Sequence, residues 1–273
     1  MHTTHTSSLG ARRSTSTRAG LALGIALSLG GFAACSDDSS PKTAPMTAED
    51  YDQVATTMGA LVADESRGEP NAFGGAVELA HGIVPASFQI SGNVVIGNLL
   101  GLDYNFSVAC RDASSAEVAC GDQATSATVA VSWSGSWTST HADASSDFDG
   151  HWSLTGLDQD LVTLDGSADA SASIAAHHEG SADTTWDLDY TATYDHVGID
   201  ADSRRAVSGS VSYALEIERG YPAQSGTVQR HFSVDGEVSF QADGTATLVL
   251  DNDQVYRMKR DGSVELVARG SLE

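Results

Sequence analysis

The stretch "TWDLDYTATYD", residues 185–195, alternates between two kinds of side chain. Even positions carry apolar residues such as Trp186, Leu188 and Tyr190, and odd positions carry only Asp or Thr. Because successive side chains of an extended strand point to opposite sides, this pattern predicts a strand with one face on a core and the other in water. The stretches "ATVAVSWSGSW" (127–137) and "AVSGSVSYALEIE" (206–218) repeat the alternation, with serine as the main polar residue.

Similar segments follow one another from about residue 101 to residue 273, and we expect the Asp-Gly pairs of this region to lie between strands. Asp-Gly is a strong hairpin-turn signal, so we expect turns at 149–150, 165–166, 235–236, 243–244 and 261–262. The sequence therefore predicts a mainly β protein. Its fold would be a large, curved, antiparallel up-and-down sheet over 101–273, arranged as a half-barrel, a barrel or a sandwich.

Residues 47–100 precede this sheet and have a different character. The stretch 46–65 has helical spacing, with Thr47 as the N-cap and two acids in the first turn, which predicts a helix from about Ala48 to Asp64. From 71 to 102 the only formal charge is Glu78, and we expect one or two short apolar helices there. A helical covering segment on a curved sheet is similar in layout to the outer-membrane lipoprotein carriers of bacteria, although no motif supports membership.

The chain is strongly acidic, with 37 Asp and Glu against 14 Lys and Arg and a formal net charge of −23. Such a charge repels nucleic acid, so we expect no nucleic-acid partner.

The N-terminal region carries an export signal. Arg12, Arg13 and Arg18 precede an apolar run, 19–34, that is shorter than the roughly 20 residues needed to span a bilayer. The run ends in "FAAC", which resembles the lipobox of bacterial lipoproteins. The resemblance implies a signal peptide over 1–34, lipidation of Cys35 and a flexible tether over 35–46. Ser36 after the cysteine favours the outer membrane, so we expect a protein held in the cell envelope by its lipid.

Two further cysteines, Cys110 and Cys120, lie close together in the first β segments. Export implies an oxidising compartment, and the Cys-x-x-Cys spacing that would favour redox or metal chemistry is absent. We therefore predict a structural disulfide between them.

A candidate metal site lies in "HADASSDFDGHW", residues 141–152. Asp143, Asp147, Asp149 and His151 could gather around Ca²⁺ or Zn²⁺, and the short oxygen side chains before Gly150 imitate the first half of a calcium loop. The acid expected at the loop's twelfth position is missing. The alternative is a solvated acidic hairpin connection without a cofactor.

Three functions remain open from the sequence. The first is a non-enzymatic envelope protein that binds a partner protein or an apolar ligand in the concavity of the sheet, lined by residues such as Trp133, Tyr190 and Leu215. The second is a purely structural lipoprotein with a filled core. The third is a hydrolase that uses His151 with Asp147 and Asp149.

Overall fold

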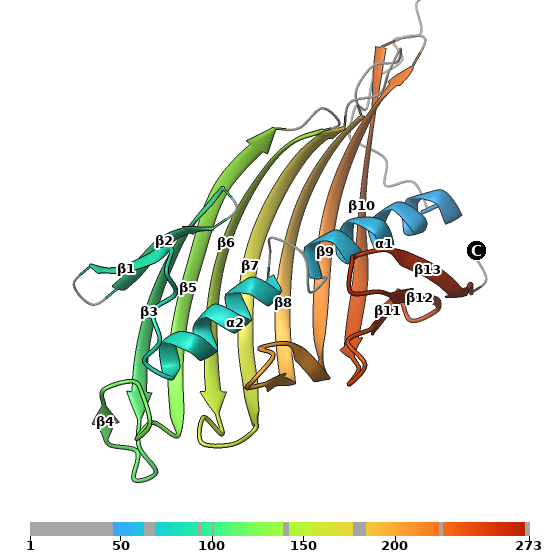
Figure 1. Ribbon diagram of the computed structural model, residues 1–273. Helices are drawn as coiled ribbons and strands as arrows, with labels where there is room; N and C mark the ends of the chain where they lie inside the picture. The colour runs from blue at the N-terminus through green and yellow to red at the C-terminus, as the bar shows by residue number, and fades with distance from the viewer. Residues whose placement is uncertain are drawn as a thin grey trace, which may run out of the picture. The chain divides into compact units, whose positions relative to one another are not determined.

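The computed structural model describes residues 46–62, 69–91, 94–99, 101–138, 142–176, 184–223 and 226–270 (Figure 1). Two helices precede a long series of strands. The helices are α1 (Ala48–Val62) and α2 (Glu69–Ala80). The strands are β1 (Phe88–Ser91), β2 (Val94–Leu99), β3 (Leu102–Arg111), β4 (Glu117–Val118), β5 (Ser126–Thr138), β6 (Ala142–Thr155), β7 (Leu161–Ala176), β8 (Thr184–Asp200), β9 (Ala206–Ala223), β10 (Gly226–Phe240), β11 (Ala246–Leu250), β12 (Gln254–Met258) and β13 (Val264–Ala268).

All strands belong to one antiparallel sheet with the order β1-β2-β3-β5-β6-β7-β8-β9-β10-β11-β12-β13, and the short β4 pairs with β3 beside this path. Each strand therefore pairs with the strands before and after it in sequence, except that β3 pairs with β5 as well as with the short β4. The sheet is curved and is not closed, since β1 and β13 form its two edges. The predicted fold class, a curved up-and-down antiparallel sheet with short N-terminal helices, is confirmed.

Both helices lie on the same face of this sheet and cross its long strands (Figure 1). Phe73 of α2 packs edge-on against Trp152 and Tyr194, with ring centroids 5.3 and 5.6 Å away. The alternation in sequence becomes an alternation in burial, because the apolar side chains of β8 point to the helices and its Asp and Thr side chains point to solvent. None of the helices in the described part of the chain has the length and apolarity needed to cross a membrane.

Helix α1 begins where the sequence predicts. The backbone N–H and the hydroxyl of Thr47 donate to the carboxylate of Asp50 at 2.8 and 2.7 Å, and the Asp50 N–H donates back to the Thr47 hydroxyl at 3.3 Å. This is a capping box, which satisfies N–H groups that the first turn leaves without helical partners.

The sheet starts earlier than the sequence indicates. The region 71–102 contains most of α2 and then the antiparallel pair β1–β2, and β2 pairs with β3 at positions such as Val95 with Phe106. The apolar run "NVVIGNLL" (93–100) is short, and a short apolar run does not distinguish a buried helix from a strand by its period. The covering segment over 47–100 is therefore helical only in its first part.

Three of the five Asp-Gly pairs, at 149–150, 165–166 and 235–236, lie inside long strands, so the turns predicted there are wrong. Gly150 faces the core, where a Cβ would meet the Phe148 ring at 2.7 Å. Gly166 has a φ of 151° at a register shift in β7, and a Cβ would meet the His151 carbonyl oxygen at 2.2 Å. These two glycines make room for close packing instead of reversing the chain.

The predicted disulfide between Cys110 and Cys120 is present. It joins the end of β3 to the loop beyond β4, and the Gly121 N–H donates to the Ala80 carbonyl at the end of α2. A closed loop of this size stabilises a fold by roughly 2–3 kcal/mol. The predicted signal peptide, Cys35 and most of the tether lie outside the described residues.

Candidate functional site

The first feature of the helix-covered face is the anchor of α1. The Asp50 side chain has no exposed surface and lies 2.7 Å from Arg230 of β10 and 3.3 Å from Arg219 of β9. Arg219 also stacks over the Trp186 ring at 5.0 Å. Helix α1 is thus joined to two neighbouring strands by a buried carboxylate and two largely buried guanidinium groups.

Burial acts to raise the pKa of Asp50, but hydrogen bonds from Thr47 and Arg230 and the charge of Arg230 outweigh it. The net effect is a pKa below the ordinary value of 3.8. Asp50 is therefore ionised whenever the anchor is formed at neutral pH.

The second feature is the anchor of α2, which uses a different chemistry. Glu69, the first residue of the helix, is 1% exposed. Its carboxyl accepts hydrogen bonds from the Tyr190 hydroxyl at 2.9 Å and the Tyr213 hydroxyl at 2.8 Å. The Tyr194 hydroxyl faces the same carboxyl with poorer geometry.

No arginine or lysine takes part in this anchor among the described contacts of Glu69. Burial raises the pKa of Glu69 above its ordinary value of 4.5, and the tyrosine hydrogen bonds offset this only in part. Burial, followed by the charge of Glu69, also raises the pKa of Tyr190 and Tyr213 well above 10. The two helices are therefore held by an ion-pair network in one case and by a protonatable hydrogen-bond cluster in the other.

The residues predicted to line a ligand cavity, Trp133, Tyr190 and Leu215, are all buried on the helix-covered face. Trp133 stacks on Phe148 with ring centroids 3.6 Å apart. A small void of about 10 Å³ beside Leu215 is lined by Val54 and Met58 of α1, among others. The space in which an apolar ligand was expected is thus largely filled by helix and sheet side chains.

The opposite, open face of the sheet carries a large shallow hollow of about 870 Å³. Its lining comes from seven strands, β3 and β5–β10, and contains mainly Asp, Ser and Thr. The lining also includes the three residues predicted to line a ligand cavity, Trp133, Tyr190 and Leu215, each of which is at most 6% exposed. The carboxylate residues in the lining are Asp103, Asp147, Asp149, Asp169, Asp189, Glu216 and Asp235.

The metal site predicted from sequence falls on this open face. Asp143, Asp147, Asp149 and His151 all lie in β6, at positions that share one face of the strand. Asp147 and Asp149 contribute to the hollow, and His151 Nδ1 lies 3.4 Å from Asp149 Oδ1. The segment is extended, so it forms neither a calcium loop nor the hairpin connection that was the alternative. Side chains two residues apart on a strand have Cα atoms about 6.8 Å apart and do not surround one point.

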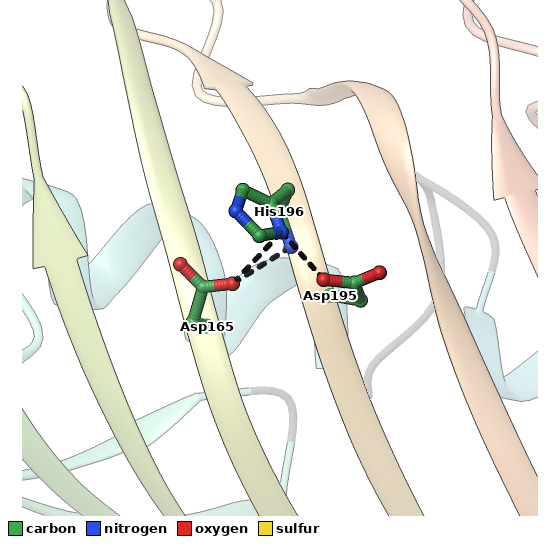
Figure 2. Close-up of side chains that lie close together, drawn as sticks. All are labelled: Asp165, Asp195 and His196. Carbon is green, nitrogen blue, oxygen red and sulfur yellow. Dashed lines mark hydrogen bonds and ion pairs between the residues drawn. The ribbon is translucent and has the colours of Figure 1, made fainter.

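A different group brings three possible metal ligands together. Among the described residues, only Asp165, Asp195 and His196 place three such atoms within 4.8 Å of one another. Figure 2 shows Asp165 on β7 facing His196 and Asp195 on the adjacent strand β8. Both strands shift register here, and His196 has a φ of 50°. The His196 N–H donates to Asp165 Oδ1 at 2.8 Å, and His196 Nδ1 lies 2.5 Å from Asp195 Oδ1.

Carboxylates with an imidazole could hold Zn²⁺ or Cu²⁺. However, the hydrogen bond to Asp195, followed by the charges of Asp165 and Asp195, raises the pKa of His196 above 6.5. These contacts favour the protonated ring, and a protonated nitrogen cannot bind a metal. The group thus forms an exposed cluster at the site of the two bulges, in which His196 contacts both carboxylates.

Sequence reasoning missed the two helix anchors and the Asp165 group. Asp50 and Arg230 are 180 residues apart, and Glu69 and Tyr213 are 144 apart, so no local pattern joins them. One signal in the sequence could have indicated the α2 anchor: Glu69 is an acid directly before the almost uncharged stretch 71–102. Comparison of the chain with known family models, curated proteins and solved structures finds no match, so the site is interpreted from its own geometry.

Proposed function

We propose that this protein is a non-enzymatic, lipid-anchored protein of the bacterial cell envelope that binds a partner protein through the open face of its sheet. The observation that carries the proposal is the hollow of about 870 Å³ across seven strands, on the face that the helices leave uncovered. Long strands paired along their whole length make this face a rigid platform. Such a surface suits binding because little conformational freedom is lost on association.

An apolar ligand is a poorer occupant than a protein. Tyr190 and Leu215 border the hollow, but they are only 6% and 2% exposed, so an apolar ligand could gain a large contact with them only by displacing helices that are anchored through Asp50 and Glu69. The open hollow, in contrast, is accessible without any rearrangement and presents polar groups, as the rims of protein interfaces do.

Cross-linking in the native host tests the binding role. A photoreactive amino acid is placed at Ser171 or Thr191, both in the lining of the hollow. The matched control places it at Thr56, an exposed position on α1. We expect a discrete adduct from the two hollow positions and none from Thr56. Monomer alone at all three positions would favour the purely structural alternative.

Lipid labelling separately tests the predicted lipid modification of Cys35. Growth with an alkyne-tagged fatty acid should label the wild-type chain, and Cys35→Ala should abolish the label and release the protein from the membrane fraction. A labelled Cys35→Ala protein would contradict the anchor assigned by the lipobox resemblance.

A further inference from the structure

The lining of the hollow has a regular order. Fourteen of its residues, all polar except Ala214, form two adjacent rungs that run across the strands. Each rung takes one residue from each of seven strands and passes from partner to partner in the sheet register. The first rung is Asp103, Ser134, Asp147, Ser171, Asp189, Glu216 and Ser233, and the second is Asn105, Ser132, Asp149, Asp169, Thr191, Ala214 and Asp235. We call these two rows the acidic rungs.

Within the acidic rungs, carboxylates stand directly opposite carboxylates. Asp149 is the register partner of Asp169, and Asp189 is the register partner of Glu216. Like charges at directly opposed positions destabilise a sheet. The fold therefore carries an unfavourable interaction on this face, and a bound cation would relieve it.

Basic side chains of the same strands are placed elsewhere. Arg219 of β9 and Arg230 of β10 point to the helix-covered face, where Asp50 pairs with them. Among the described residues that line the hollow, none is Lys, Arg or His. Two histidines outside the lining approach the acidic rungs: His231 lies 3.1 Å from Glu216, and His151 lies 3.4 Å from Asp149. The described ion pairs bring no basic side chain to the other five carboxylates of the lining.

The size of the acidic rungs suits an extended chain. Seven strands at a spacing of about 4.8 Å span about 29 Å, and the two rungs lie about 6.8 Å apart along the strands. An extended polypeptide covers this distance with about nine residues. A chain lying across the strands between the rungs could place a flexible cationic side chain near carboxylates of either row.

Resting on the proposed function, we infer that the partner docks on the acidic rungs through an extended segment rich in Lys or Arg, laid across the strands. Charge complementarity carries the inference: a hollow with seven carboxylates and no basic lining residue selects a cationic segment and excludes an acidic one.

The test uses the full-length lipidated protein in detergent and a synthetic ten-residue oligolysine as the probe, with ten-residue oligoglutamate and Gly-Ser peptides as negative probes. Binding is measured by calorimetry at two salt concentrations. The test variant is D149N/D169N/D189N/E216Q, which keeps side-chain size and removes both opposed pairs. The control variant, D122N/D158N/D160N/D202N, removes the same charge from exposed positions outside the long strands.

We expect wild-type protein to bind oligolysine, with an affinity that falls as salt rises. The test variant should lose about tenfold or more in affinity, and the control variant about twofold or less. Equal losses in the two variants would mean that only net charge matters and would overturn the inference. Absence of oligolysine binding to the wild-type protein would overturn it as well.

Cross-linking from Ser171 separates this inference from the proposed function. An adduct that persists in the test variant means that the partner is not held by the rungs, so the inference fails and the proposed function stands. If the wild-type chain yields no adduct but oligolysine binds selectively, the rungs do bind cationic chains and the proposed function is the part that fails.

Discussion

On the helix-covered face of the sheet, Asp50 lies 2.7 Å from Arg230, whereas on the open face Asp149 stands directly opposite Asp169. One sheet thus matches opposite charges where water is excluded and places like charges together where water is present. Unpaired charge is far more costly in the interior than at the surface, where solvent screens it. The charges of the covered face contribute to stability, and in the proposed function those of the open face are available for binding. The predictions below test this difference.

The largest effect is expected for Asp50→Ala. It leaves two largely buried guanidinium groups without their carboxylate and removes the capping box of α1, so we expect a loss of about 3–4 kcal/mol in the free energy of unfolding. The measurement is denaturant unfolding followed by circular dichroism. Glu49→Ala is the control, because Glu49 is 72% exposed and 3.6 Å from Arg219. Similar losses in the two variants would contradict the assignment of the anchor to Asp50.

The second effect concerns Glu69. Glu69→Ala leaves the Tyr190 and Tyr213 hydroxyls buried without their partner and should cost about 2–3 kcal/mol. Glu69→Gln keeps a hydrogen-bonding group and should cost clearly less. If the two variants lose the same amount, the hydrogen bonds seen at this carboxyl contribute little to the docking of α2.

The pH dependence of the two anchors should have opposite signs. The folded pKa of Glu69 is raised, so the native state holds its proton more tightly, and stability falls as pH rises above 4.5. Asp50 has a lowered folded pKa, so its contribution is present above 3.8 and is lost as pH falls through the folded value. The measurement is denaturant unfolding over a pH series. Compared with the wild-type protein, the free energy of unfolding should depend less on pH above 4.5 in Glu69→Gln and less on pH below 3.8 in Asp50→Asn. Unchanged slopes would contradict these assignments.

On the open face the sign of the stability effect reverses. Asp169→Asn or Asp189→Asn removes a carboxylate–carboxylate opposition and should raise the free energy of unfolding by about 0.2–1 kcal/mol at low salt. Added salt should reduce the gain, because it already screens the repulsion in the wild-type protein. A loss of stability in both variants would show that these carboxylates are not in an unfavourable arrangement.

The smallest effect concerns His196, whose imidazole lies beside the carboxylates of Asp165 and Asp195. Asp195→Asn should lower the pKa of His196 toward 6.5, since the hydrogen bond that the His196 ring donates to Asp195 is the main cause of its increase. The stabilising contribution of the pair is present at low pH and is lost as pH rises through the folded pKa. NMR titration of the imidazole ring measures the shift, with Asp149→Asn as a control that should leave His196 unchanged.

Local pattern was sufficient for much of the architecture. The alternation in 185–195 is a property of each strand alone, so it correctly predicts β8 and the antiparallel class. The start of α1 at Ala48 and the Cys110–Cys120 pair also depend on residues close in sequence. The predictions that were wrong, such as a turn at Asp149-Gly150, arise because the dipeptide has the same signature in a turn and at a crowded strand position beside Phe148.

The sequence by itself determined that this chain forms long two-faced strands, a capped first helix and a disulfide, and that its surface is acidic. Only the tertiary structure decided which acids are partnered. Asp50 and Arg230 meet across 180 residues because the sheet register and the docking of α1 bring them together. The acidic rungs likewise exist only through the register of seven strands. Periodicity is encoded within a strand, but the neighbour of each charge is set by pairing between strands, which no local pattern specifies.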